Sequence, residues 1–263
     1  MDEVFAPALL AGQVAVVTGG SAGIGRAIAG RFAALGADVV LVGRSEDRLR
    51  AAAQAIAAET GRECALFPCD VRDEESVAAL RDHVLKLFGT VTVVVNNAAA
   101  NFEMPAARMT RRAFTTVVDV DLVGTFTVTR AFVGDMIDHG GGSVLNIVVP
   151  DAERGFPGYA HSGAAKAGVI SLTRTWAREW GPHGIRVNAL GPGPVPTEGV
   201  ARNMLGLAED ATGEAFADTV ERVPMRRLGT VDDIATASVF LCCPGAGWIT
   251  GVSLNVDGGM NVA

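Results

Sequence analysis

The sequence is poor in aromatic, charged and basic residues. Aromatic side chains make up 6% of the 263 residues and charged ones 19%, and Tyr159 is the single tyrosine. Hydrophobic residues make up 49%, which is enough apolar surface to offset the entropy lost on folding and excludes a disordered chain. The 22 basic and 29 acidic residues give a net charge of −7, so we expect no nucleic-acid partner.

Membrane, secretion and metal signals are also missing. No apolar run is long enough to span a bilayer, and the chain opens with Asp2 and Glu3 instead of a basic signal segment. The four cysteines have no zinc-ligand spacing, and a core of this size needs no disulfides. We therefore expect a cytoplasmic protein that binds neither a membrane nor a metal.

Short β-branched runs alternate with longer helical patterns along the whole chain. Strands are predicted at 14–18, 38–42, 65–67, 91–95, 143–149, 185–190 and 252–256. Helices are predicted at 24–35, 46–59, 74–88, 111–138, 158–180 and 232–241. This alternation requires parallel strand pairing with helices on both faces. It predicts an α/β fold: a single Rossmann domain over 1–263, with a doubly wound parallel sheet of about seven strands. A Gly- and Pro-rich stretch predicts a substrate-side insert at about 194–225, with one or two helices over 201–222.

The segment between the first strand and the first helix, Thr18 to Gly25, has the sequence TGGSAGIG. Glycines there allow a tight turn and close approach of a pyrophosphate, which the helix N-terminus attracts through its free N–H groups and dipole. Because the turn lies between a strand and a helix, it predicts nucleotide binding.

Further motifs occur in the order typical of one family. Asn96-Asn97-Ala98-Ala99 follows the fourth predicted strand, and Pro192-Gly193 follows the sixth. With the glycine-rich turn and the Asp257-Gly258-Gly259 ending, they make essentially the whole chain resemble the short-chain dehydrogenase/reductase family. The resemblance implies a nicotinamide cofactor and a homotetramer, with a homodimer as the alternative. The expected cofactor-binding residues are Gly19, Ser21, Ala22, Gly23, Ile24, Gly25, Arg44, Ser45, Asp70, Val71, Asn97, Ala98, Ala99, Lys166, Pro192, Gly193, Val195 and Thr197.

The end of the second predicted strand indicates which nicotinamide is bound. An acidic residue there would bind the adenosine ribose hydroxyls and repel a 2′-phosphate. This sequence has Arg44 and Ser45 instead. A guanidinium suits a phosphate dianion, and a hydroxyl adds a donor, so we predict NADP(H). The family resemblance implies that Asp70 and Val71 contact the adenine ring.

The catalytic pattern of the family is broken. Ordinary members use Asn, Ser, Tyr and Lys, with the tyrosine four residues before the lysine on one helix. Here Lys166 is present, but Ser162 stands in the tyrosine position and Asp121 in the asparagine position. The position of the motif serine is held by Val149, followed by Pro150. The pattern does not favour ordinary ketone reduction.

The single tyrosine supplies another possibility. Tyr159 precedes Lys166 by seven residues, and seven steps of about 100° return to nearly the same helix face. That spacing resembles enoyl-thioester reductases, a divergent branch of the same family. The segments 146–150, 155–157 and 161–165 resemble the peroxisomal 2-enoyl-CoA reductase type. Our hypothesis gives Tyr159 the role of hydrogen-bond donor to an enolate oxygen. Lys166 would anchor the nicotinamide ribose, and Ser162 would be a second donor.

The predicted function is therefore NADPH-dependent reduction of a conjugated C=C bond in an enoyl thioester or small enone. Two alternatives stay open. One is a reductase of an imine or ketone in specialised metabolism, with Ser162 or His161 as the donor. The other is a catalytically inactive sensor or scaffold that binds NADP(H).

Overall fold

The computed structural model describes residues 5–150, 152, 155, 157–199 and 217–262. Its strands are β1 (Val14–Thr18), β2 (Asp38–Gly43), β3 (Ala65–Pro68), β4 (Val93–Asn96), β5 (Gly142–Ile147), β6 (Ile185–Pro192) and β7 (Ser253–Val256). All neighbouring pairs are parallel, in the order β3-β2-β1-β4-β5-β6-β7. The predicted doubly wound parallel sheet is confirmed.

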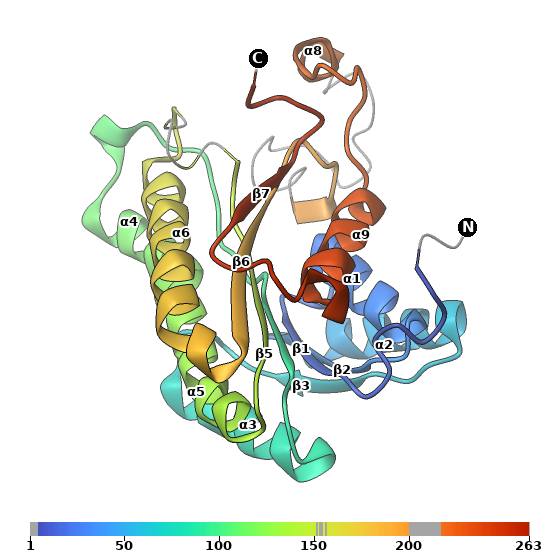
Figure 1. Cartoon of the computed structure of the whole chain (residues 1–263). Helices are drawn as coiled ribbons and strands as arrows, with labels where there is room; N and C mark the ends of the chain where they lie inside the picture. The colour runs from blue at the N-terminus through green and yellow to red at the C-terminus, as the bar shows by residue number, and fades with distance from the viewer. Residues whose placement is uncertain (1–4, 151, 153–154, 156, 200–216, 263) are drawn as a thin grey trace.

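Helices cover both faces of this sheet (Figure 1). One layer contains α1 (Gly23–Ala34), α2 (Glu46–Thr60) and α9 (Val231–Cys242). The other contains α3 (Glu74–Phe88), α4 (Arg111–Val118), α5 (Gly124–Asp138) and α6 (Ala160–Trp180). A short helix, α8 (Ala217–Arg222), lies beyond the sheet.

Alternation of side chains along the strands creates two apolar cores. On β1, Ala15 and Val17 belong to the core under α1, α2 and α9, whereas Val14 and Val16 belong to the core under α3, α5 and α6. Because both faces of the sheet are covered, the strands are continuous apolar runs. Such a sheet gives rigid support to the loops at the strand ends.

Three predicted boundaries differ from the structure near the expected site. The helix predicted over 111–138 is interrupted by a π-helical turn, Asp119–Val123, which contains Asp121. The fifth strand ends at Ile147 instead of Val149, and α6 begins at Ala160 instead of Gly158. A π turn is typical of functional sites and leaves no signal in hydrophobic periodicity. Most of the insert predicted at 194–225 lies outside the described residues.

Arg186 on β6 closes the C-terminal end of α9. Its guanidinium donates to the main-chain oxygens of Leu241 (2.6 Å), Cys242 (3.2 Å) and Cys243 (3.3 Å), which helix bonding leaves free. Arg186→Met keeps the apolar stem but removes these donors, so we expect the free energy of unfolding to fall by about 2–3 kcal/mol in urea titration. Arg178→Met, at an exposed position on α6, should change it by less than about 0.5 kcal/mol. Equal losses in both variants would contradict this role.

In the described ranges, no helix has both the length and the apolar character that a membrane crossing requires. The same residues contain no group of three or more His, Cys, Asp or Glu side chains that could hold a metal ion.

Candidate active site

Hydrogen bonds join the C-terminal ends of β1 and β4. These two strands lie side by side where the chain, after building the sheet outward from β1 to β3, returns to build it in the opposite direction. Thr18 Oγ1 accepts from the main-chain nitrogens of Asn97 (2.9 Å) and Ala98 (3.0 Å). The Asn97 amide donates back to the Thr18 carbonyl at 3.0 Å. Open α/β sheets bind ligands at this crevice. The structure thus brings Asn97 and Ala98 beside the glycine-rich turn, where they fix its shape.

The glycine-rich turn forms a cradle in which two positions, Gly19 and Gly25, admit no side chain. A Cβ on Gly19 would lie 2.7 Å from the Asn97 amide nitrogen, and one on Gly25 would overlap the Gly19 carbonyl. Gly19 and Gly23 also have positive φ angles of 64° and 52°. The N-cap of α1, Ala22, makes no side-chain hydrogen bond, so the first N–H groups of the helix remain available to an anion. The cradle fits a pyrophosphate group.

The segment after β6 lies against the start of α1. A Cβ on Gly23 would contact the Thr197 side chain at 3.4 Å, and Val195 is buried. Gly193 donates to the Val256 carbonyl at 2.9 Å, and a Cβ there would lie 2.5 Å from Asp257 Cα. Close packing therefore requires glycine at 193 and holds Thr197 at the cradle.

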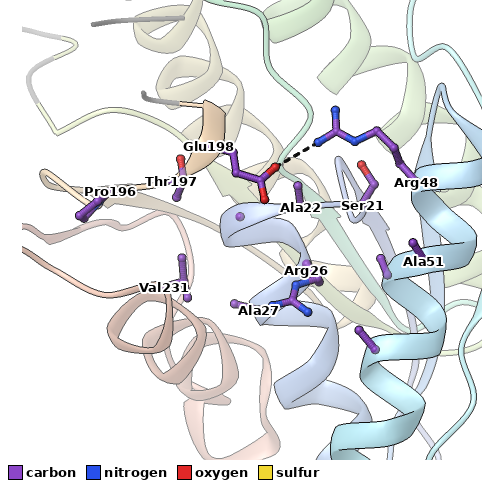
Figure 2. Close-up of a pocket in the computed structure, with 13 residues that line it drawn as sticks. Ser21, Ala22, Arg26, Ala27, Arg48, Ala51, Pro196, Thr197, Glu198 and Val231 are labelled. Carbon is purple, nitrogen blue, oxygen red and sulfur yellow. Dashed lines mark hydrogen bonds and ion pairs between the residues drawn. The ribbon is translucent and has the colours of Figure 1, made fainter. Parts of the chain in front are cut away.

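A groove of about 570 Å³ borders the cradle (Figure 2). Ser21 and Ala22 lie between its two charged walls, Arg48 on α2 and Glu198 after β6. The two walls form an ion pair at 3.5 Å, with both side chains about half exposed. Arg48 was not predicted from the sequence, because nothing in the residues around it separates it from the other arginines at the start of α2.

Arg44 and Ser45 are exposed where β2 gives way to α2. The Ser45 hydroxyl accepts from the Arg48 main-chain nitrogen at 3.4 Å, so its proton is free to face a ligand. Asp70 forms a two-pronged pair with Arg72 at 2.9 and 2.5 Å. That hydrogen bonding lowers the pKa of Asp70, and the nearby charge of Arg44 lowers it further. Arg44, predicted to bind the 2′-phosphate, and Asp70, predicted to contact the adenine, therefore lie near each other.

Lys166 and Asp121 form an ion pair inside the protein. Lys166 Nζ lies 3.4 Å from Asp121 Oδ2 and donates to the Ile147 carbonyl at 3.0 Å. The side chains are only 6% and 1% exposed, and no other ion pair between described residues has both partners so deeply buried. The Ala100 main-chain nitrogen donates to Asp121 Oδ1 at 2.8 Å, whereas Oδ2 makes no hydrogen bond within the described ranges. Because burial of charge is costly, a pair at this depth is a candidate functional position.

Ser162 and His161 lie in the first turn of α6, where Ser162 is 4% exposed and His161 is completely buried. The Ser162 main-chain nitrogen donates to His161 Nδ1 at 2.7 Å. The His161 ring packs edge-on against Phe102, with 4.6 Å between ring centroids. Burial lowers the pKa of His161, and the Phe102 main chain and the Asp121 carboxylate offset only part of that shift.

Tyr159 lies just before α6, as its N-cap, and its carbonyl accepts the first helical hydrogen bond from Gly163 at 2.9 Å. The side chain is buried, and burial raises the pKa of the phenol, with a further contribution from Glu103. The prediction placed Tyr159 inside the helix, so its two-turn spacing from Lys166 is approximate. Its role as a donor stays a prediction.

A doubly wound sheet, a glycine cradle at its switch point and a buried lysine beside it define a dinucleotide-binding oxidoreductase fold. Residues 19–261 match the family model described as enoyl-(acyl carrier protein) reductase. The chain belongs to the short-chain dehydrogenase/reductase family, whose members use a nicotinamide cofactor.

Three relatives illustrate the similarity. A rat protein named peroxisomal 2,4-dienoyl-CoA reductase, (3E)-enoyl-CoA-producing, is 41% identical over 98% of this chain and 86% of its own. A Bacillus subtilis protein named "Probable 2,4-dienoyl-CoA reductase", (2E)-enoyl-CoA-producing, is 37% identical over 94% of this chain and 96% of its own. A Beutenbergia cavernae structure with bound NADP at low occupancy has a TM-score of 0.89 and 35% identity, and covers 98% of this chain and 100% of its own.

Proposed function

We propose that the protein uses NADPH to reduce a conjugated C=C bond of a 2,4-dienoyl or 2-enoyl thioester. The observation that carries the proposal is the buried Lys166–Asp121 pair in a site where Ser162 replaces the tyrosine of carbonyl reduction. Similarity to proteins named 2,4-dienoyl-CoA reductases supports it.

The reaction has two parts. When bound, the reduced nicotinamide supplies a hydride, which adds to C5 of a 2,4-dienoyl thioester. The π electrons then move toward the thioester oxygen, which becomes an enolate anion. A proton taken up from solvent at C2 restores the carbonyl and leaves a 3-enoyl thioester, whereas uptake at C4 leaves a 2-enoyl thioester. The central task of the protein is to stabilise the enolate oxygen.

We assign roles to the three predicted catalytic residues accordingly. Tyr159 donates a hydrogen bond to the enolate oxygen, and Ser162 is a second donor. Lys166 anchors the nicotinamide ribose. Asp121 and the Ile147 carbonyl hold the Lys166 ammonium in one position, so Asp121 is a positioning residue.

The preference for NADPH over NADH is part of the proposal. Arg44 and Ser45 present a guanidinium and a hydroxyl at the end of β2, and Asp70 is already paired with Arg72. These groups suit a 2′-phosphate better than free ribose hydroxyls.

A substrate panel tests this function. NADPH consumption is measured with 2,4-hexadienoyl-CoA, 2-hexenoyl-CoA, 3-oxohexanoyl-CoA and a cyclic imine, and products are identified by mass spectrometry. We expect turnover with the conjugated thioesters. Turnover of only the ketone or imine would overturn the proposal in favour of a carbonyl or imine reductase. Tight NADPH binding without turnover on any compound would favour a sensor.

The proposal also covers the oligomeric state of the protein and its cellular compartment. We infer one domain with a substrate-side insert, acting in the cytoplasm as a homotetramer, although several relatives are named peroxisomal. The apolar residues Phe240, Trp248 and Leu254 are exposed around the edge strand β7, and Phe126 is exposed on α5. Exposed apolar surface at a sheet edge and on a helix supports contacts with further copies.

A further inference from the structure

His161 is completely buried, and its two ring nitrogens differ in their bonding. Its exposed fraction is 0%, although its position is next to the N-terminal end of α6. Nδ1 accepts the hydrogen bond from the Ser162 main-chain nitrogen. Nε2 makes no hydrogen bond of acceptable geometry in the part of the chain that the structure describes.

The local helix geometry explains the Nδ1 bond. The first N–H groups of a helix have no acceptor inside it, and the N-cap of α6, Tyr159, provides no side-chain acceptor. His161 Nδ1 therefore satisfies the N–H of Ser162. An accepting Nδ1 carries no proton in the neutral ring, so the hydrogen-bond network assigns the proton to Nε2.

Nε2–H is thus a buried donor with no acceptor at normal hydrogen-bond distance and angle among the described residues, and the Phe102 main chain interacts with the ring only weakly. Such a group costs about 1–3 kcal/mol, and its retention calls for a ligand that completes it. Its surroundings belong to the active site: the ring packs on Phe102, in the loop that Asp121 holds through Ala100, and the Asp121 carboxylate is close enough to influence the ring.

We infer that the Nε2–H of His161 donates a hydrogen bond to the carbonyl oxygen of the thioester substrate. This inference rests on the proposed function and adds a donor that the Tyr159 assignment does not supply. The hydrogen bond strengthens as the oxygen becomes an enolate, so it stabilises the transition state more than the bound substrate. The neutral ring acts as a fixed dipole, and the proton stays on Nε2 throughout.

Two substitutions separate the two nitrogens. The Oδ1 atom of His161→Asn can accept from Ser162 as Nδ1 does, but this variant has no donor at the Nε2 position. The amide nitrogen of His161→Gln reaches approximately that position. With 2,4-hexadienoyl-CoA, we expect kcat to fall about 100-fold in His161→Asn and about 10-fold or less in His161→Gln. NADPH affinity, measured by fluorescence, should stay within about threefold in both variants.

A binding measurement needs no turnover. The complex of the protein with NADP⁺ is titrated with hexanoyl-CoA and with S-hexyl-CoA, a thioether without the carbonyl oxygen. The wild type should prefer the thioester by about tenfold or more, and His161→Asn should lose that preference. His139→Asn is the matched control, because His139 is exposed and its ring bonds only the Asp135 carbonyl among described residues.

The outcomes are distinct. If His161→Asn keeps the kcat and the thioester preference of the wild type, or if His161→Gln falls as far as His161→Asn, the inference is wrong. If the wild type reduces no conjugated thioester, the proposed function fails, while the two titrations still show whether His161 recognises the carbonyl oxygen.

Discussion

Lys166→Met is expected to lower kcat by at least about 10³-fold and to destabilise the fold. The variant removes the ammonium that is assigned to the nicotinamide ribose, and loss of such an organising group has effects of this size. It also leaves the Asp121 carboxylate, which is 1% exposed, without its counter-charge. Breaking a buried ion pair in this way costs about 3–5 kcal/mol. Stopped-flow kinetics and urea titration measure the two effects.

The double variant Lys166→Met/Asp121→Asn separates catalysis from folding. The asparagine can still accept from the Ala100 main chain, as Asp121 Oδ1 does, but it carries no charge. We therefore expect the double variant to regain most of the lost stability and none of the activity. If activity returned together with stability, Lys166 would have only a structural role.

Arg44→Asp is expected to weaken NADPH binding by about 10³-fold and to leave NADH binding equal or tighter. The substitution removes a charge-assisted hydrogen bond and introduces repulsion of the 2′-phosphate, while the new carboxylate can bind ribose hydroxyls. The milder Arg44→Ala should lower NADPH affinity about 10- to 100-fold, the equivalent of about 1.5–3 kcal/mol. Fluorescence titrations with both nucleotides measure the change in preference.

Arg50→Ala is the matched control for this experiment. Arg50 is an exposed arginine on α2, the helix that follows Arg44, and it is paired with Glu46 at 2.5 Å, so its loss should leave both affinities unchanged. If Arg44→Ala lowered NADPH and NADH affinity equally, the guanidinium would not recognise the 2′-phosphate, and the predicted cofactor preference would be wrong.

The number of strands and the existence of most helices could be predicted because their signals are local. β1 and α3 have the predicted bounds, since each is an uninterrupted apolar or amphipathic pattern with a clear end. Asp73 caps α3 through the Glu75 main-chain nitrogen, and Gly89 ends it in a left-handed conformation. The strand order is set by packing between distant segments, which periodicity in the sequence does not contain.

The site was predictable only where glycines or charges mark it. The cradle at Gly19 to Gly25 and the choice of Lys166 as a site residue followed from motifs, whereas Asp121, which pairs with Lys166, lies in a π turn that the sequence pattern did not indicate. From the sequence, Asp121 could orient water or Lys166, or could mark lost ketone chemistry; the structure pairs it with Lys166. The tautomer of His161 required the Ser162 contact, which is visible only in three dimensions.

The fate of the transferred hydrogen distinguishes reduction of the C=C bond from reduction of a carbonyl group. The protein is given NADPH carrying two deuterium atoms at C4 of the nicotinamide, with equal amounts of 2,4-hexadienoyl-CoA and 3-oxohexanoyl-CoA. We expect one deuterium at C5 of the reduced dienoyl chain and unchanged 3-oxohexanoyl-CoA. Deuterium at C3 of a 3-hydroxyhexanoyl product, with the diene intact, would contradict it.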